Sequence, residues 1–291
     1  MATLYYYNNV SSDWSLITNW YTNQAHTIPA GRIPNSTDTA VILSDVGLVT
    51  GAYVNPAVLQ LGLPDASISI NFYPSATINI PIVNSYYSGI GSNGGSYTFG
   101  TLNMNAGGIN GTFNVTTANF YNISTGNSGT ANIYGTANFY TNSSNGSGDN
   151  DDGYVYGVAN FYNNSQNANG NAGAGDGNSG WVYGNANFYN TSANAALDND
   201  GSGNQGGAQG HVIGTATFHD NAGNGYINPL GGTSYGTATN IVYTNSNPFN
   251  TDLQAIAEAS SISAPAYGGG GITGTNILLT ELLKIPFPIT L

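Results

Sequence analysis

Gly135-Thr-Ala-Asn-Phe-Tyr140 is the stretch that decides the fold, because the chain repeats it. Copies stand at Thr116–Tyr121, Gly157–Tyr162, Gly184–Tyr189 and Gly214–His219, and a decayed copy begins at Gly236. The starts are 19, 22, 27, 30 and 22 residues apart. Self-similarity at roughly 20–50 residues is typical of stacked supersecondary units that bury their apolar faces against one another.

A short apolar run precedes each phrase, and together they alternate strictly. One set of alternate positions reads Ile133-Gly135-Ala137-Phe139, Val155-Gly157-Ala159-Phe161, Val182-Gly184-Ala186-Phe188 and Val212-Gly214-Ala216-Phe218. The other set reads Tyr134-Thr136-Asn138-Tyr140, Tyr156-Val158-Asn160-Tyr162, Tyr183-Asn185-Asn187-Tyr189 and Ile213-Thr215-Thr217-His219. Period two is the strand period, so we expect the first set to face a core and the second to face outward. The inward glycine predicts a bend between two strands.

Units of this kind predict an all-β fold, a parallel β-helix or β-solenoid with irregular rungs about 4.8 Å apart. The end copies are irregular, since Asn114 and Asn240 fall on the core register. Terminal repeats of a solenoid are expected to be atypical because they cap it. A β-sandwich of hairpins that share the motif is the alternative fold.

The copies differ in the inserts that follow each phrase. These inserts span Asn122–Ser128, Thr141–Asp152, Asn163–Ser179 and Asn190–Gln209, and they consist mainly of Asn, Ser, Gly, Ala and Asp. We expect them to leave the solenoid at one corner and to crowd on one side. Insertions in repeat proteins commonly build the binding face, although these could also act as spacers between molecules.

Charge is scarce and negative. Arg32 and Lys284 are the two basic residues, and the net charge is −12. Two cations cannot neutralise a run of phosphates, so nucleic acid is excluded as a partner and an anionic membrane is disfavoured. The chain has no cysteine, and Met1–Tyr7 lacks the basic and apolar segments of a signal peptide. No stretch reaches the roughly 20 apolar residues of a membrane span.

We divide the chain into three regions on composition: an N-terminal capping or attachment region (1–65), a repeat domain (66–245) and a C-terminal region (246–291). The last region holds a predicted helix at Thr251–Ala259, a glycine hinge and the apolar tail Ile277–Leu291. We expect this tail to mediate oligomerisation. The alternative is that it folds back over its own solenoid.

Acidic residues in the inserts raise two chemical alternatives. Asp149, Asp151, Asp152, Asp198 and Asp200 supply oxygens of the kind that calcium prefers. Their spacing is not that of an EF-hand, so turn-forming aspartate is the simpler interpretation. Paired carboxylates could also hydrolyse glycosidic bonds, but none lies in a predicted strand that would hold it rigidly. We therefore expect no enzyme, no cofactor and no firm metal site, with calcium a minor alternative.

Outward aromatic side chains are the stronger candidate site. These residues are Tyr134, Tyr140, Tyr156, Tyr162, Tyr183, Tyr189 and His219. They should form ladders up the solenoid. Tyrosine combines an apolar ring with a polar tip, which suits it to interfaces. We interpret the ladders as a subunit interface or a glycan-binding surface; the alternative is a stack that only stiffens the sheet.

The N-terminal region carries a second pattern. Asp13-Trp14 and Asn19-Trp20 are followed by Gly31-Arg32-Ile33-Pro34, Asp38, Ala40 and Ile42. This resembles the W…NW…G-x-P-x-x-x-D-x-A-x-I opening of many bacterial and phage β-solenoid surface proteins. We expect the two tryptophans to cover the open end of the solenoid and Thr39–Leu43 to start a rung.

Together with the Asn-Phe-Tyr-x-x-Ser rungs, this opening is similar to that of phage virion proteins of the tail-spike, tail-fibre and decoration type. The resemblance implies a homotrimer, assembled in the host cytoplasm and displayed on the virion surface among other virion proteins, that binds a host surface glycan. A capsid decoration protein, a cell-surface β-solenoid adhesin and a polysaccharide depolymerase are the alternatives.

Overall fold

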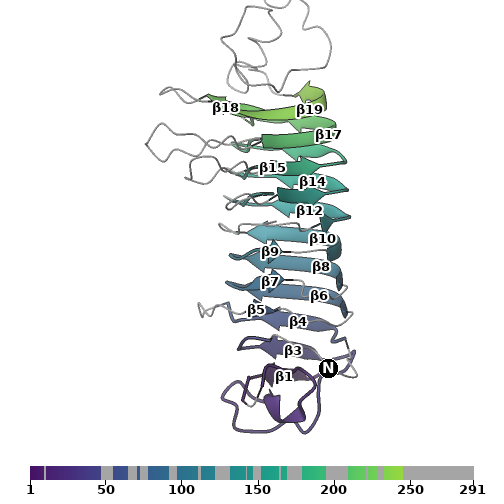
Figure 1. Ribbon diagram of the computed structural model, residues 1–291, viewed down its shortest axis with the longest axis vertical. Helices are drawn as coiled ribbons and strands as arrows, with labels where there is room; N and C mark the ends of the chain where they lie inside the picture. The colour runs from purple at the N-terminus through teal and green to yellow at the C-terminus, as the bar shows by residue number, and fades with distance from the viewer. Residues whose placement is uncertain are drawn as a thin grey trace, which may run out of the picture.

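The protein is a column of stacked β-strands, seen here in a computed structural model (Figure 1). The structure describes residues 1–9, 11–46, 55–64, 71–72, 78–91, 97–110, 113–121, 132–141, 143–146, 152–163, 165–168, 179–194, 209–220, 222–227 and 233–244. The N-terminal strands lie at one end of the column and β19 lies near the other (Figure 1).

Each rung of the column has up to three sides. The early strands are β1 (Thr3–Tyr6), β2 (Trp20–Tyr21), β3 (Thr39–Ile42) and β4 (Val58–Leu61), with a 3₁₀ turn at Ile17–Asn19. Long strands that bend through the first and second sides are β6 (Ile78–Tyr86), β8 (Tyr97–Asn105), β10 (Phe113–Tyr121), β17 (Gln209–Phe218) and β19 (Thr233–Tyr243). Elsewhere these sides are separate strands.

The separate first-side strands are β11 (Asn132–Ile133), β13 (Asp152–Val155) and β15 (Ser179–Val182). Those of the second side are β12 (Thr136–Phe139), β14 (Val158–Phe161) and β16 (Ala186–Phe188). The third side holds β5 (Asn71–Phe72), β7 (Gly89–Gly91) and β9 (Ile109–Asn110), and β18 (Gly225–Ile227) pairs antiparallel with β19.

Parallel pairing in register joins the rungs. Sixteen of the strands in the described ranges form one sheet, and a second sheet joins β5, β7 and β9. Along the second side the repeated phrases lie directly over one another, so that Ala118, Ala137, Ala159, Ala186 and Ala216 make one column. This arrangement confirms the predicted all-β parallel solenoid.

The core is a column of stacked phenylalanine rings. Phe120, Phe139, Phe161, Phe188 and Phe218 are fully buried, and successive ring centroids lie 4.8 to 4.9 Å apart. Parallel strands put identical residues at one strand spacing, which is a suitable distance for offset stacking of rings. The predicted inward set is therefore confirmed for these side chains.

The bend between the first and second sides requires glycine. A Cβ built on Gly157 would lie 2.0 Å from the carbonyl oxygen of Gly135, and one on Gly184 would lie 2.0 Å from that of Gly157. Real side chains do not approach a backbone atom this closely. The glycine predicted to mark a bend does so, because only its missing side chain lets one rung settle on the next.

The N-terminal segment covers the start of the column (Figure 1). Trp14 and Trp20 are fully buried, their ring centroids lie 4.8 Å apart, and Trp20 Nε1 donates to the Trp14 carbonyl at 2.9 Å. Strand β1 pairs with β3, which starts the first rung as expected. Both tryptophans belong to the same continuous core as the phenylalanine column.

One ion pair fastens this segment. Arg32 donates to the buried carboxylate of Asp38, which also accepts from the backbone nitrogens of Ala2 and Asn35. The hydrogen bond from Arg32 holds the pKa of Asp38 well below its usual range. Because folding lowers the pKa of Asp38, the ion pair stabilises the fold fully above the pKa that Asp38 has in the unfolded chain. This stabilisation is lost as the pH falls through the pKa of Asp38 in the folded protein.

The structure corrects the register at both ends of the repeat. Asn114 is exposed, while Phe113 and Val115 on either side of it are buried. Asn240 is also exposed, and Ile241 packs against the core. In β10 and β19 the bend is one residue shorter than in the intervening rungs. The residues that face the core before the bend are therefore shifted by one position relative to the other copies. The predicted helix Thr251–Ala259 and tail Ile277–Leu291 lie outside the described residues.

Candidate functional site

Four exposed side chains form a ladder at the bend of the late rungs. This first-side ladder comprises Tyr134, Tyr156, Tyr183 and Ile213, which are 50%, 41%, 42% and 48% exposed. The Tyr134 and Tyr156 ring centroids are 4.9 Å apart, and those of Tyr156 and Tyr183 are 4.8 Å apart. The sequence correctly placed these residues outward and in line.

An extra residue at the bend accounts for this exposure. In β10, Val115 and Ala118 are the buried residues that flank the bend, three positions apart. In the next rungs the flanking buried residues are four positions apart, as with Val155 and Ala159. A one-residue change of phase moves a side chain from the core face to the solvent face. Val115 and Tyr156 each stand three residues before the buried alanine of their rung. Val115 is buried in β10, whereas Tyr156 points outward in its later rung.

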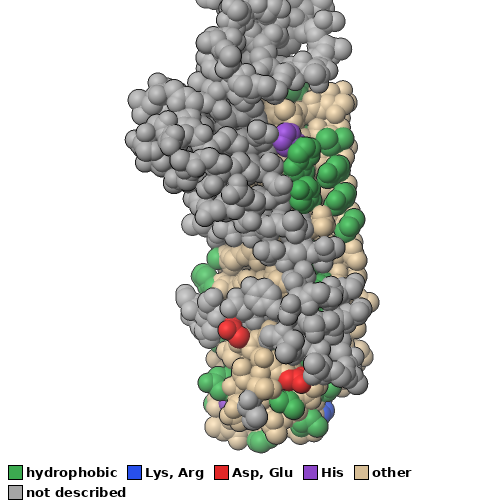
Figure 2. Space-filling view, in the orientation of Figure 1, with side chains coloured by type: hydrophobic (Ala, Val, Ile, Leu, Met, Phe, Trp, Pro, Cys, Tyr) green, Lys and Arg blue, Asp and Glu red, His purple; other side chains and the backbone are tan. Residues whose placement is uncertain are grey.

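A second outward column runs beside this ladder on the first side. Tyr154, Trp181 and His211 lie in register on β13, β15 and β17. The ring centroids of Trp181 and His211 lie 3.9 Å apart, and His211 Nδ1 lies 2.8 Å from Thr237 Oγ1. Figure 2 shows hydrophobic side chains gathered over the late rungs with a histidine beside them. Sequence reasoning gave Trp181 no role, although it stands at an outward position of the same alternation.

The second side carries its own aromatic ladder. This second-side ladder comprises Tyr121, Tyr140, Tyr162, Tyr189 and His219, with centroids 4.4 to 5.0 Å apart. Burial raises the pKa of Tyr121 and Tyr162, and their neighbours in the stack raise it further. Burial, followed by its two stacked neighbours, likewise raises the pKa of Tyr156 in the first-side ladder. These phenols therefore stay neutral near pH 7.

An amide ladder runs beside the second-side ladder. Asn84, Asn103, Asn119, Asn138, Asn160 and Asn187 are half-buried, and from Asn103 onward each Nδ2 donates to the Oδ1 of the asparagine in the preceding rung at 2.8 to 2.9 Å. The sequence placed several of these residues in the outward set without predicting their hydrogen bonds. Together, the two ladders make a face that contains no Asp, Glu, Lys or Arg.

A third ladder, which sequence reasoning missed, is buried on the third side. It comprises Asn145, Asn167, Asn194 and Asn224, in which each of the first three donates from Nδ2 to the Oδ1 of the next at 2.9 Å. The first three are fully buried and Asn224 is 7% exposed. Their signal in the sequence is an asparagine five positions after Tyr140, Tyr162, Tyr189 and His219.

The buried asparagines also hold the stems of the inserts. Asn167 Nδ2 donates to the carbonyl of Gly180, which lies in the first-side strand of the next rung. Asn224 Nδ2 donates in the same way to the carbonyl of Gly236. A Cβ on Gly180 would lie 1.3 Å from the Asn167 carbonyl oxygen, so glycine is required there. We call each such pair an Asn–Gly clasp. The clasp closes the rung, whatever length of chain lies between its two residues.

The clasps revise the predicted boundaries of the inserts. The stretches Thr141–Asp152, Asn163–Ser179 and Asn190–Gln209 each begin with a buried third side that contains Ser143, Ser165 or Ser192. Only the chain beyond the buried asparagine can be an insert, because the serine and the asparagine before it are buried in the rung. Positions 122–128 lie outside the described residues.

Four of the five candidate calcium ligands lie outside the described residues, so calcium binding stays a prediction. Asp152 begins β13 rather than lying in a loop, while Asp149, Asp151, Asp198 and Asp200 lie outside the described residues. Among the residues described, no three His, Cys, Asp or Glu side chains gather as a metal site would need. Within the same residues, no helix has the length and hydropathy needed to cross a membrane.

Stacking limits what the aromatic ladders can bind. Within each ladder, an inner ring such as Tyr156 or Tyr162 has both faces covered by its neighbours. A sugar could reach only the edges and hydroxyls of these rings. The exposed first-side ladder is therefore better suited to packing against another protein surface than to stacking on sugars.

Comparison with known proteins adds no family to this description. No protein-family model, curated protein or solved structure matches the chain.

Proposed function

We propose that this chain is a non-enzymatic structural protein of a phage-type virion surface, a homotrimeric spike or fibre that binds a host-surface glycan. A rigid column of parallel rungs supports such a role, because its core is continuous from the N-terminal cap to the late rungs. The resemblance of the Trp14–Ile42 opening to virion proteins carries the particle assignment.

The first-side ladder is the observation that supports assembly. Three tyrosines and an isoleucine, each between 41% and 50% exposed, stand in line on one rigid surface. Trp181 and His211 extend this surface on the adjoining column. Contiguous exposed apolar side chains on a soluble protein commonly mark a protein–protein contact. We assign the contact between subunits to this surface.

The inserts are the proposed glycan-binding face. Their stems leave the column at successive clasps, so they emerge one above another on the same side. Their Asn, Ser, Gly and Asp residues offer many hydrogen-bonding groups and no lysine or arginine. This composition suits uncharged, hydroxyl-rich partners better than phosphates.

Light scattering of a charged variant tests the assembly. The double variant Tyr156→Lys/Tyr183→Lys should reduce the mass of the full chain from that of a trimer to that of a monomer, because it brings like charges together at each contact. The matched control is Tyr162→Lys/Tyr189→Lys, which disrupts a stack of the same kind on adjacent rungs of the other side. It should leave the trimer intact.

An unchanged mass in the first variant, with its circular dichroism preserved, would reject the first-side interface. The assignment to a particle is tested separately, with an antibody against the chain. It should label purified virions, and label confined to cell envelopes would favour an adhesin.

A further inference from the structure

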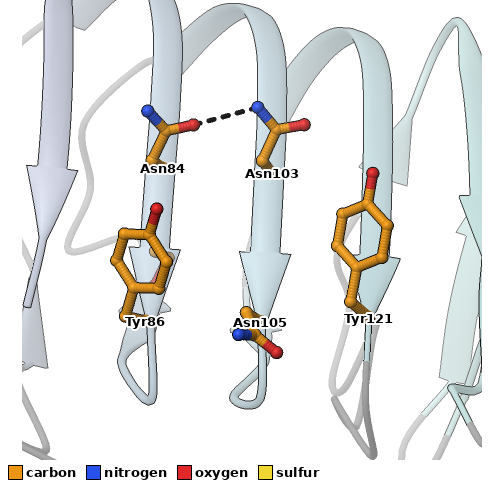
Figure 3. Close-up of a pocket in the computed structure, with 6 residues that line it drawn as sticks. Asn84, Tyr86, Asn103, Asn105 and Tyr121 are labelled. Atoms are coloured by element: carbon orange, nitrogen blue, oxygen red, sulfur yellow. Dashed lines mark hydrogen bonds between the residues drawn. The ribbon is translucent and has the colours of Figure 1, made fainter. Parts of the chain in front are cut away.

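A gap one ring wide lies at the Tyr121 end of the second-side ladder. Strand pairing places Tyr86, Asn105 and Tyr121 in one column, on β6, β8 and β10. Each rung from Tyr121 to His219 supplies a ring to this column, and Tyr86 supplies a ring on the other side of Asn105. At Asn105 the column has an amide in place of the ring. Figure 3 shows Asn105 between the two tyrosines.

A cavity of about 250 Å³ stands at this gap, lined by Asn84, Ser85, Tyr86, Asn103, Asn105 and Tyr121 (Figure 3). Tyr86 and Tyr121 are two rungs apart, or about 9.6 Å at the usual strand spacing. Neighbouring rings in the ladder are separated by 4.9 to 5.0 Å, which is half that distance. The gap therefore has room for one flat ring between the two tyrosines.

Tyr121 presents a ring face to the gap. One face of Tyr121 stacks on Tyr140 at 4.9 Å, with the two planes 5° apart. The opposite face points toward the rung of Asn105, because the ladder repeats by translation along the column. Unlike the inner rings of the ladder, Tyr121 can thus receive a ligand on a ring face. Its side chain is 37% exposed.

The remaining lining is neutral and polar. Asn103 donates to Asn84 Oδ1 at 2.9 Å and accepts from Asn119, so its amide is held in a fixed orientation beside the gap. None of the described residues that line the cavity is Asp, Glu, Lys or Arg. Aromatic walls with a few oriented amides are the usual features of a site for a flat, uncharged, hydroxyl-bearing ligand.

We propose that this gap binds a single pyranose ring with equatorial hydroxyls, inserted between Tyr86 and Tyr121. The axial C–H groups of such a sugar form apolar faces that pack on the two tyrosines. Its hydroxyls lie around the rim, where the Asn103 and Asn105 amides can hydrogen-bond them. An aromatic side chain would bring only apolar ring edges to this polar rim, whereas the hydroxyls of a sugar match its polarity, so the sugar is the better occupant. The inference deepens the glycan-binding part of the proposed function and does not depend on the subunit interface.

The test uses the full chain and methyl β-D-glucopyranoside, followed by saturation-transfer NMR. A ligand of this size should bind weakly, with a dissociation constant on the order of 1 mM. Methyl β-D-galactopyranoside has one axial hydroxyl that would press on a tyrosine face, so its signal should be roughly tenfold weaker.

The variant Asn105→Tyr supplies the missing ring. It should complete the ladder, raise the melting temperature and abolish saturation transfer from the glucoside. Asn114→Tyr makes the same exchange at an exposed first-side position and should retain binding. Tyr121→Ala removes one wall and should also abolish binding, which keeps the test decisive if Asn105→Tyr folds poorly.

Three outcomes would overturn the proposal: no transfer to the wild-type chain at sugar concentrations on the order of ten millimolar, undiminished transfer to Asn105→Tyr, or binding of p-cresol in place of the sugar. The Tyr156→Lys/Tyr183→Lys variant should still bind the glucoside. Loss of the trimer without loss of sugar binding would separate the two assignments.

Discussion

The early rungs and the late rungs share their second side and differ at the bend. In β8, Phe99 and Leu102 flank the bend at a spacing of three, while in the late rungs Val182 and Ala186 flank it at a spacing of four. In β19 the spacing across the bend is again three residues, between Ala238 and Ile241. The pairing of β17 with β19 shifts register at this point. One additional residue at the bend thus turns a buried position into an exposed aromatic one without changing the core of the second side.

The third side differs as well. The early rungs close it with the short parallel strands β5, β7 and β9. The late rungs close it with isolated bridges and the buried asparagine ladder. Side-chain amides can satisfy backbone carbonyls at the point where the chain leaves the column. The late rungs can therefore carry inserts of different lengths.

The core column is the feature that both kinds of rung share, and its loss should have the largest effect. Phe188→Ala should lower the free energy of unfolding by roughly 3–5 kcal/mol, since a buried ring is removed from a closed stack. Met104 occupies the same column in an early rung. Met104→Ala should cost about 2–5 kcal/mol. Urea unfolding measures both variants, and a loss below about 1 kcal/mol for Phe188→Ala contradicts the stacked core.

Buried and half-exposed amide ladders should differ in energy. Asn167→Ala removes donors to Asn194 Oδ1 and to the Gly180 carbonyl, and it leaves buried groups unsatisfied. Each such group costs about 1–3 kcal/mol, so we expect a loss near 3 kcal/mol. Asn138→Ala breaks the half-exposed ladder, where water can replace the partner, and should cost about 1 kcal/mol. Equal losses in urea unfolding would show that the two ladders do not differ as described.

Much of this architecture could be predicted from the sequence, because strict alternation specifies a face. The phenylalanine column, the glycine bend and the outward tyrosines follow from period two repeated in four copies. The phase of Asn114 could not be predicted, since aligning the copies assumes that every bend has the same length. Compositional reasoning also assigned Asn145, Asn167 and Asn194 to loops, because buried asparagine is rare unless its partners are known. Only the parallel register supplies those partners.

The smallest change in stability should come from shortening the insert that follows the buried Asn194. Residues 195–208 can be replaced with the sequence of 146–151, because Asn145 and Asp152 occupy the same rung positions as Asn194 and Gln209. Closure entropy changes slowly with loop length, so the free energy of unfolding should change by less than about 1 kcal/mol. Host-cell attachment by particles that carry the variant should fall, since this insert belongs to the proposed glycan-binding face.

The matched control makes the same replacement and adds Asn194→Ala. It removes the donors from Asn194 to Asn224 Oδ1 and to the Thr237 carbonyl, and should lose about 3 kcal/mol more in urea unfolding. If the graft alone destabilises the fold as much as this control, the insert is part of the rung and Asn194 is not its boundary. If the graft preserves both stability and attachment, the inserts are spacers. Recognition would then have to lie on the column, where the gap at Asn105 is the candidate.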